Sequence, residues 1–355
     1  MRDLNRRLLM LVALLLFPAP ALAQPAAKGP VKVFLLAGQS NMQGYGHIRT
    51  LDWLGEDPQH GKLLQKLKKA DGSYAERPDV WIYSKSGGTV RKGNLTVGYG
   101  VSKDNIGPEL MFGQVMGDAL ENQVLLIKTA WGGRSLAVNF RPPSAGALPL
   151  ANYPENQRKG LEESIQNGKL KVGDEYQQMV QEVRDVLANL KEHFPAYDGQ
   201  GAELAGFVWF QGWNDMINKD FTAEYAKNLE HLIRDLRRDL KQPKLPVVVA
   251  QMGVGGAKLS ANVVAFRKAQ EAGAAIPEFK GNVALVDTAP CWDEKAQALL
   301  DEGYKGNKWL NQDLQDRFSK MGSQPPYHYL GSAKVHCLMG QALGEAMKGL
   351  CQPTK

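Results

Sequence analysis

The sequence predicts an α/β fold, a three-layer α/β/α sandwich built on a five-stranded parallel sheet. Two patterns support this prediction. Short, continuous apolar runs recur along the chain, as in strands that are covered on both faces. Amphipathic segments with apolar residues at three-to-four spacing separate the runs, so helical, right-handed crossovers are expected to join parallel strands. The predicted strands are residues 31–37, 124–130, 205–211, 246–252 and 283–287.

Helices and long loops are expected between these strands. A helix over residues 108–121 begins at Gly107-Pro108, because proline suits the first helical turn. Apolar stripes predict core-facing helices at residues 175–194, 222–240 and 332–350. Two segments, near residues 45–105 and 138–175, interrupt the pattern and follow strand ends, where long loops commonly shape a cleft. The second segment is rich in proline, and the first carries Trp53, Trp81, Tyr83 and Tyr99.

The first 23 residues have the pattern of a secretory signal peptide. A basic start precedes the apolar run 8–17, and Ala21-Leu22-Ala23 forms a small-residue cleavage site. The run is too short to span a membrane. We therefore expect residues 24–355 to form a single exported domain, periplasmic or extracellular, with no membrane attachment after cleavage.

Composition excludes several classes of partner and cofactor site. The formal net charge is +6, and removal of the first 23 residues leaves +4, with no Lys/Arg block of the kind that binds nucleic acid. No Cys/His spacing indicates zinc. Three cysteines do not make a disulfide framework. The count allows either one bridge, Cys337 to Cys351, or buried thiols without a bridge. The sequence gives no indication of oligomeric state.

The ends of three predicted strands carry residues suited to acyl transfer. The first strand delivers Ser40 within Gly38-Gln39-Ser40-Asn41-Met42. A hydroxyl needs a base to become a nucleophile, and the oxyanion it creates needs fixed hydrogen-bond donors. Gly132-Gly133 follows the second strand and can present a backbone N–H. Asn214, in Gly212-Trp213-Asn214-Asp215 after the third strand, can donate without adding charge.

These three segments resemble blocks I, II and III of the SGNH hydrolases, which have a flavodoxin-like fold. More narrowly, they are similar to the branch of carbohydrate acetylesterases that includes acetylxylan esterases and sialate O-acetylesterases. The resemblance implies a Ser40 nucleophile that needs no metal or organic cofactor. It implies an oxyanion hole of the Ser40 N–H, the Gly133 N–H and the Asn214 side chain. Supporting or substrate-binding roles are expected for Gln39, Gly132, Gln211 and Asp215.

A histidine near the last helix is the expected general base. His328 lies in a loop just before that helix, and His336 lies inside it, so we favour His328, because a loop can aim the imidazole at the active face. SGNH enzymes usually carry an aspartate three residues before the histidine. That position holds Pro325 before His328 and Ala333 before His336. Either a Ser–His dyad operates, or another carboxylate substitutes, for which Asp287 and Asp316 are the candidates.

The leading hypothesis is a secreted serine esterase that removes O-acetyl groups from a carbohydrate such as acetylxylan, sialic acid or a related glycan. Because the expected aspartate is missing, the alternative is a catalytically impaired glycan-binding protein on the same fold. An α/β-hydrolase is disfavoured because its Gly-x-Ser-x-Gly elbow would need glycine at Met42. The glycine-rich run 253–258 lacks the Gly-Lys-Ser/Thr ending of a phosphate-binding loop. The sequence does not identify the sugar.

Overall fold

A computed structural model describes residues 29–86 and 88–352, so the predicted signal peptide lies outside the described residues. Its centre is a seven-stranded sheet of order β4-β3-β6-β1-β7-β8-β9, in which only β4 runs antiparallel to its neighbour. The strands are β1 (Val31–Gly38), β3 (Arg77–Ser86), β4 (Thr89–Leu95), β6 (Val124–Ala130), β7 (Ala202–Phe210), β8 (Val247–Gln251) and β9 (Val283–Asp287).

The predicted α/β sandwich is confirmed, and all five predicted strands are present. The expected strand count was wrong, because β3 and β4 extend the sheet beyond β6. Both strands lie in the segment near residues 45–105 that was expected to be a cleft loop. The strand β3 starts with polar residues, and β4 is an edge strand with several exposed or half-exposed side chains, so neither reads as a continuous apolar run.

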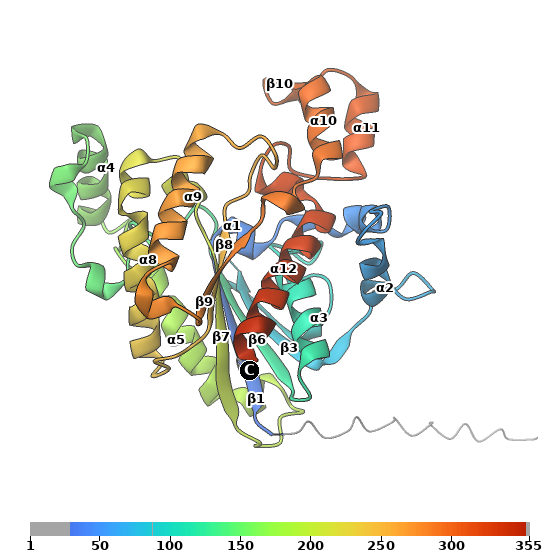
Figure 1. Cartoon of the computed structure of the whole chain (residues 1–355), viewed down its shortest axis with the longest axis horizontal. Helices are drawn as coiled ribbons and strands as arrows, with labels where there is room; N and C mark the ends of the chain where they lie inside the picture. Colours follow the sequence, from blue (N-terminus) through green and yellow to red (C-terminus); the bar gives the residue numbers. More distant parts are fainter. Residues whose placement is uncertain (1–28, 87, 353–355) are drawn as a thin grey trace, which may run out of the picture.

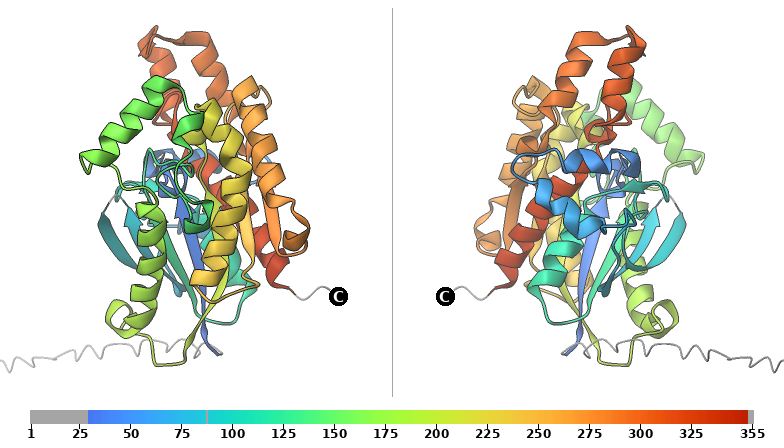
Figure 2. Two further views of the ribbon diagram at one scale, coloured as in Figure 1. Left: turned by 90° about the vertical axis from the view of Figure 1, so that its left-hand side faces the viewer. Right: turned by 90° about the vertical axis from the view of Figure 1, so that its right-hand side faces the viewer.

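Helices cover both faces of the sheet (Figure 1, Figure 2). On one face α3 (Glu109–Ala119) packs against α12 (Ala333–Cys351), and the Phe112 ring meets Phe34 of β1 edge-on. The other face is covered by α5 (Asp174–Ala188), α8 (Lys219–Asp239) and α9 (Ala261–Ala274). The helices α3, α5, α8 and α12 correspond to the four predicted helices, whereas α9 was not predicted. No helix in the described part of the chain is long and apolar enough to cross a membrane.

Several smaller elements lie near the carboxyl ends of the strands. The helices α4 (Glu155–Gln166), α10 (Glu294–Gly303) and α11 (Gln312–Ser319) project at this end of the molecule (Figure 1). The remaining short pieces are α1 (Ser40–Gln43), α2 (Leu64–Leu67), α6 (Leu190–His193), α7 (Trp213–Met216) and the two-residue strands β2 (Gly46–His47), β5 (Asn105–Ile106), β10 (Tyr304–Lys305) and β11 (Lys308–Trp309).

The register of the three central strands aligns their carboxyl ends. Gly38 of β1 is level with Ala130 of β6 on one side and with Phe210 of β7 on the other. The ends of β1 and β7 approach each other so closely that position 38 requires glycine, because a Cβ there would lie 2.1 Å from the Phe210 carbonyl oxygen. Segments that follow these strands therefore begin at one edge of the sheet, where ligands bind in open α/β folds.

The two long segments contribute less to a cleft than expected. In the first, Trp81, Tyr83 and Tyr99 are buried in the core instead of lining a cleft. The second contains α4 and packs around a small apolar cluster in which Val138 and Tyr153 meet Phe221 of α8. The aromatic and proline content of these two segments therefore did not show whether they line a cleft or pack against the core.

All three cysteines are free thiols, so the Cys337–Cys351 bridge does not form. Both residues lie on the single helix α12, fourteen positions apart, which at 1.5 Å per residue separates them by about 21 Å. A disulfide needs Cα atoms within about 7 Å. Buried thiols, the other expectation, describe Cys291 and Cys337, whereas Cys351 is exposed.

Candidate active site

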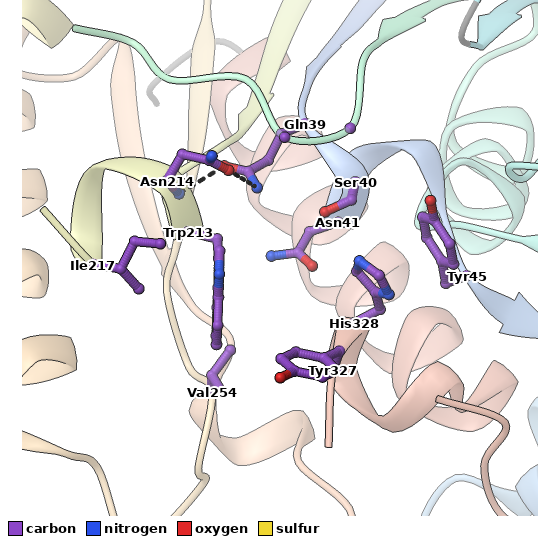
Figure 3. A pocket seen from close by; sticks show the side chains of 12 residues that line it. Gln39, Ser40, Asn41, Tyr45, Trp213, Asn214, Ile217, Val254, Tyr327 and His328 are labelled. Carbon is purple, nitrogen blue, oxygen red and sulfur yellow. Dashed lines mark hydrogen bonds between the residues drawn. The ribbon is translucent and has the colours of Figure 1, made fainter. Parts of the chain in front are cut away.

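A pocket of about 520 Å³ opens at the carboxyl ends of β1, β6 and β7 (Figure 3). This volume suits a small substrate or one sugar unit of a larger one. Its lining combines most of the residues predicted from the sequence with several that were not predicted. The lining residues are Gln39, Ser40, Asn41, Tyr45, Gly132, Gly133, Trp213, Asn214, Ile217, Val254, Tyr327 and His328.

Ser40 is the first residue of α1, directly after the turn that ends β1. It is 6% exposed and lines the pocket. The first N–H groups of a helix have no partner within the helix. Within the described residues, the Ser40 N–H makes no hydrogen bond. A hydroxyl and a free N–H from one residue therefore occupy the same wall.

Gln39 fixes the orientation of Asn214. Its side-chain N–H donates to Asn214 Oδ1 at 3.2 Å, and its Oε1 accepts from Gln211 Nε2 and from the Gly212 N–H, both at 3.1 Å (Figure 3). Because the Asn214 oxygen is already engaged, its NH₂ group is the part left to donate to a ligand. A fixed neutral donor of this kind is what an oxyanion requires.

The Gly132-Gly133 turn forms the neighbouring part of the wall. Gly133 has φ +70°, a left-handed conformation that favours glycine, and open space surrounds its Cα. The turn therefore brings bare backbone to the pocket. In the described residues the Gly133 N–H has no hydrogen-bond partner, so it is available to a bound group.

Gln211 and Asp215 lie behind the pocket and do not line it. The Asp215 carboxylate accepts from the Leu136 and Ala137 N–H groups, both at 2.9 Å, and from Gln211 Nε2 at 2.6 Å. Burial raises the pKa of Asp215 to about 6, while these hydrogen bonds oppose the increase. The carboxylate thus ties α7 to the segment after Gly133, and with no exposed surface it cannot reach a substrate.

His328 lies in an unusual left-handed turn that also includes Tyr329, Leu330 and Gly331. Their φ values are 52°, 53°, 64° and 59°. Each non-glycine residue in this conformation costs about 1–2 kcal/mol, so the turn needs strong tertiary support. Fully buried Tyr329 supplies it, because its hydroxyl accepts from the Gly253 N–H at 2.9 Å and hydrogen-bonds to Thr288 Oγ1 at 2.7 Å.

The imidazole of His328 is held by an aromatic ring. Tyr45 stacks on it with ring centroids 3.9 Å apart and planes 14° from parallel. Burial lowers the pKa of His328, so the ring is neutral near pH 7 and can accept a proton. Its Nδ1 is buried and has no hydrogen-bond partner among the described residues, which leaves Nε2 to reach the pocket.

Neither candidate acid lies in the pocket. Asp287 pairs with Arg267 at 2.7 Å and accepts from the Ala289 N–H. Asp316 is on α11 and accepts from Gln312 at 2.8 Å. With Nδ1 unpartnered, the geometry corresponds to a serine and a histidine without an orienting carboxylate. In place of a carboxylate, the structure shows the Tyr45 ring stacked on the imidazole.

His336 lies behind the pocket and is completely buried. Its Nε2 accepts the Tyr45 N–H at 3.4 Å, and burial lowers its pKa to about 3, with Lys128 adding to the decrease. It therefore supports the backbone under the Tyr45–His328 stack. Nearby, Lys128 donates to the Gln43 carbonyl and to Glu109, whose other oxygen accepts from the Gly107 N–H.

Sequence reasoning missed the aromatic and aliphatic residues of the pocket. Tyr45, Trp213 and Tyr327 each follow or precede a predicted site residue within five positions, and this proximity was the signal available. Ile217 and Val254 gave none.

Within residues 29–86 and 88–352, no group of three or more His, Cys, Asp or Glu side chains is placed to hold a metal ion.

A three-layer α/β fold with this pocket at its strand ends is the architecture expected of an SGNH-like carbohydrate esterase, a class of carboxylic ester hydrolases. The model of the family described as "carbohydrate esterase, sialic acid-specific acetylesterase" matches residues 30–302. The chain therefore belongs to this family. The matched range includes Ser40, Gly133 and Asn214 and ends before His328.

Individual relatives are more distant. An Arabidopsis thaliana protein described as a probable carbohydrate esterase is 34% identical over 56 residues, or 16% of this chain and 22% of the relative. The X-ray structure of a protein from the same Arabidopsis locus has TM-score 0.50 at 16% identity, covering 90% of this chain and 98% of that one, which supports the fold. A Xanthomonas citri carbohydrate acetylesterase has TM-score 0.42 at 13% identity, covering 72% and 49% of the two chains.

Proposed function

We propose that this protein is an exported serine esterase that removes O-acetyl groups from carbohydrate. The observation that carries the proposal is the meeting of Ser40, Gly133, Asn214 and His328 in one pocket. Membership of a carbohydrate esterase family supports hydrolysis, and gives no support to the non-catalytic glycan-binding alternative.

The first half of the reaction transfers the acetyl group to the enzyme. Nε2 of His328 takes the Ser40 proton as Oγ attacks the acetyl carbonyl carbon. The new oxyanion accepts hydrogen bonds from the Ser40 and Gly133 N–H groups and from the Asn214 amide. Collapse of the tetrahedral intermediate breaks the bond to the sugar oxygen, which leaves with the proton from His328.

The second half releases acetate. Water enters the pocket, His328 takes one of its protons, and the hydroxide attacks the acetyl-serine carbonyl at the same oxyanion site. When this intermediate collapses, the proton returns from His328 to Ser40 Oγ and acetic acid departs, which ionises to acetate in water. Because His328 is neutral before each step, its lowered pKa keeps it ready to act as the base.

Replacement of the nucleophile tests the proposal. Ser40→Ala should reduce hydrolysis of p-nitrophenyl acetate to background without changing the melting temperature, since only one hydroxyl oxygen is lost. Ser164→Ala removes a hydroxyl from α4, outside the pocket, and should retain full activity. A serine-reactive phosphonate should label the wild type and fail to label Ser40→Ala. An active Ser40→Ala enzyme, or an unlabelled wild type, would refute the proposal.

Export is tested separately. The pattern of residues 1–23 leads us to expect a mature chain that starts at Gln24 and is recovered outside the cytoplasm. Amino-terminal sequencing of the protein recovered from each cell fraction identifies both its first residue and its compartment. Recovery of the uncleaved chain in the cytoplasmic fraction would contradict this part of the proposal.

A further inference from the structure

We propose that Trp213, Tyr327 and Ile217 form a rim that binds the sugar ring, and that this subsite takes uncharged acetylated sugars in preference to anionic ones such as sialic acids. The inference rests on the proposed function, because it names the substrate class for the same pocket. The proposed preference differs from the sialic acid specificity in the family's description. We therefore argue it from the residues of this chain alone.

The rim is apolar and unusually exposed. Ile217 is 58% exposed and Tyr327 is 48% exposed, although both are large hydrophobic residues. The Trp213 and Tyr327 rings stand edge to face with centroids 6.2 Å apart, on the side of the pocket away from Tyr45 (Figure 3). Apolar groups gathered at the mouth of a pocket mark a binding surface. The C–H face of a pyranose ring is the part of a carbohydrate that packs on such a surface.

The pocket offers a ligand amides, hydroxyls, backbone and aromatic rings. None of its twelve lining residues is Asp, Glu, Lys or Arg, and burial holds the pKa of His328 below its usual value, so this side chain is neutral near pH 7. Arg134, the residue after Gly133, is turned to a separate cavity, where it pairs with Glu175 at 2.6 Å. A sugar carboxylate in the pocket would lose water without meeting a cation, which is costly.

A pair of substrates that differ only in charge tests the selection. Methyl glucoside and methyl glucuronide, each acetylated at the same hydroxyl, are compared at pH 7 together with an O-acetylated N-acetylneuraminate. We expect kcat/KM for the glucoside ester to exceed that of either anionic ester by about tenfold or more. Equal or faster hydrolysis of the anionic esters would overturn the inference.

Variants at Ile217 locate the selection at the rim. Ile217→Lys adds a cation at the mouth of the pocket and should raise the glucuronide-to-glucoside ratio of kcat/KM several-fold. Leu310→Lys is the matched control. Leu310 is 61% exposed, close to the 58% of Ile217, but it lies outside the pocket. A ratio that moves equally in both variants, or in neither, would show that the rim does not set the preference.

The apolar contact is tested by truncation. Ile217→Ala should lower kcat/KM for the glucoside ester about threefold relative to p-nitrophenyl acetate, which has no pyranose ring to pack on the rim. Leu310→Ala should leave that ratio unchanged. An unchanged ratio in Ile217→Ala would overturn the sugar subsite.

The same assays separate this inference from the proposed function. Wild-type hydrolysis of p-nitrophenyl acetate that depends on Ser40 establishes the esterase, whatever the sugar preference proves to be. Hydrolysis without preference for the neutral sugar refutes the inference alone. Failure to hydrolyse any of the esters refutes both.

Discussion

The stack of Tyr45 on His328 gives a prediction that separates two roles of Tyr45: orientation of the imidazole by the aromatic ring and an effect of the phenol hydroxyl. Tyr45→Leu removes the aromatic face and keeps an apolar side chain of intermediate size. The backbone contacts of Tyr45, its N–H to His336 and its carbonyl to Asn105, remain available. The variant should therefore fold, and its imidazole should lose the surface that holds it 3.9 Å away and nearly parallel.

The size of the effect follows from two contributions. A stacked aromatic pair is worth about 0.5–1.5 kcal/mol beyond the area it buries. The ring face also stabilises the imidazolium formed during the reaction, by about 0.5–1 kcal/mol at a partly exposed site. Together these give about 1–2.5 kcal/mol, or a decrease in kcat of about 5- to 70-fold. Tyr45→Phe keeps the ring and should stay within about twofold of wild type.

The assay is the hydrolysis of p-nitrophenyl acetate, with kcat and KM measured across pH and a thermal melt of each variant. A role in positioning predicts that kcat falls in Tyr45→Leu and recovers in Tyr45→Phe, while the melting temperatures stay close. If Tyr45→Leu keeps the wild-type kcat, the stack does not orient the base. If Tyr45→Phe is as slow as Tyr45→Leu, the hydroxyl is responsible and the argument from stacking is wrong.

Three further predictions follow from the pocket and its support. Asn214→Ala removes the oriented oxyanion donor and should lower kcat about 10²- to 10³-fold with a small change in KM, measured with p-nitrophenyl acetate; a change below tenfold would contradict the role. Because the proposed base His328 acts in its neutral form and burial lowers its pKa, activity should persist on acidification until the pH is below 6.5; an acid limb of kcat/KM above 6.5 would contradict this. Asp215→Ala leaves three donors unpaired behind the pocket and should cost about 3 kcal/mol of stability; an unchanged denaturant midpoint would show that the carboxylate is not a structural tie.

The sequence predicted the buried part of the fold well because burial leaves a direct pattern. The strands β1, β6, β7 and β8 are covered on both faces and read as continuous apolar runs. The strand β4 has water on one side and β3 for its partner, so its residues carry no such run. Edge strands depend on pairing more than on composition, and pairing between β3 and β6 joins segments far apart in the sequence.

The site was predictable where a residue sits at a strand end, and less so elsewhere. Ser40, Gly133 and Asn214 follow aligned strands, so the topology brings them together. Their chemical roles remain predictions. Tyr45 could not be assigned, because its stacking partner is contributed by a turn near the other end of the described chain. Asp287 and Asp316 were reasonable acids by type, but Arg267 and α11 hold them elsewhere.

The left-handed turn at His328 has a consequence for how the protein acquires its reactivity. Its supports come from distant parts of the chain: the Thr50 hydroxyl accepts the Ala333 N–H across 283 positions, and Tyr45 donates to His336 across 291. A chain that ends before the turn would still contain Ser40, Gly133 and Asn214, but it would lack His328, the proposed base. With the proposed roles, Ser40 becomes reactive only after both ends of the described chain have docked, and we expect a proteolytic cut before the turn to abolish activity while Ser40 stays in place.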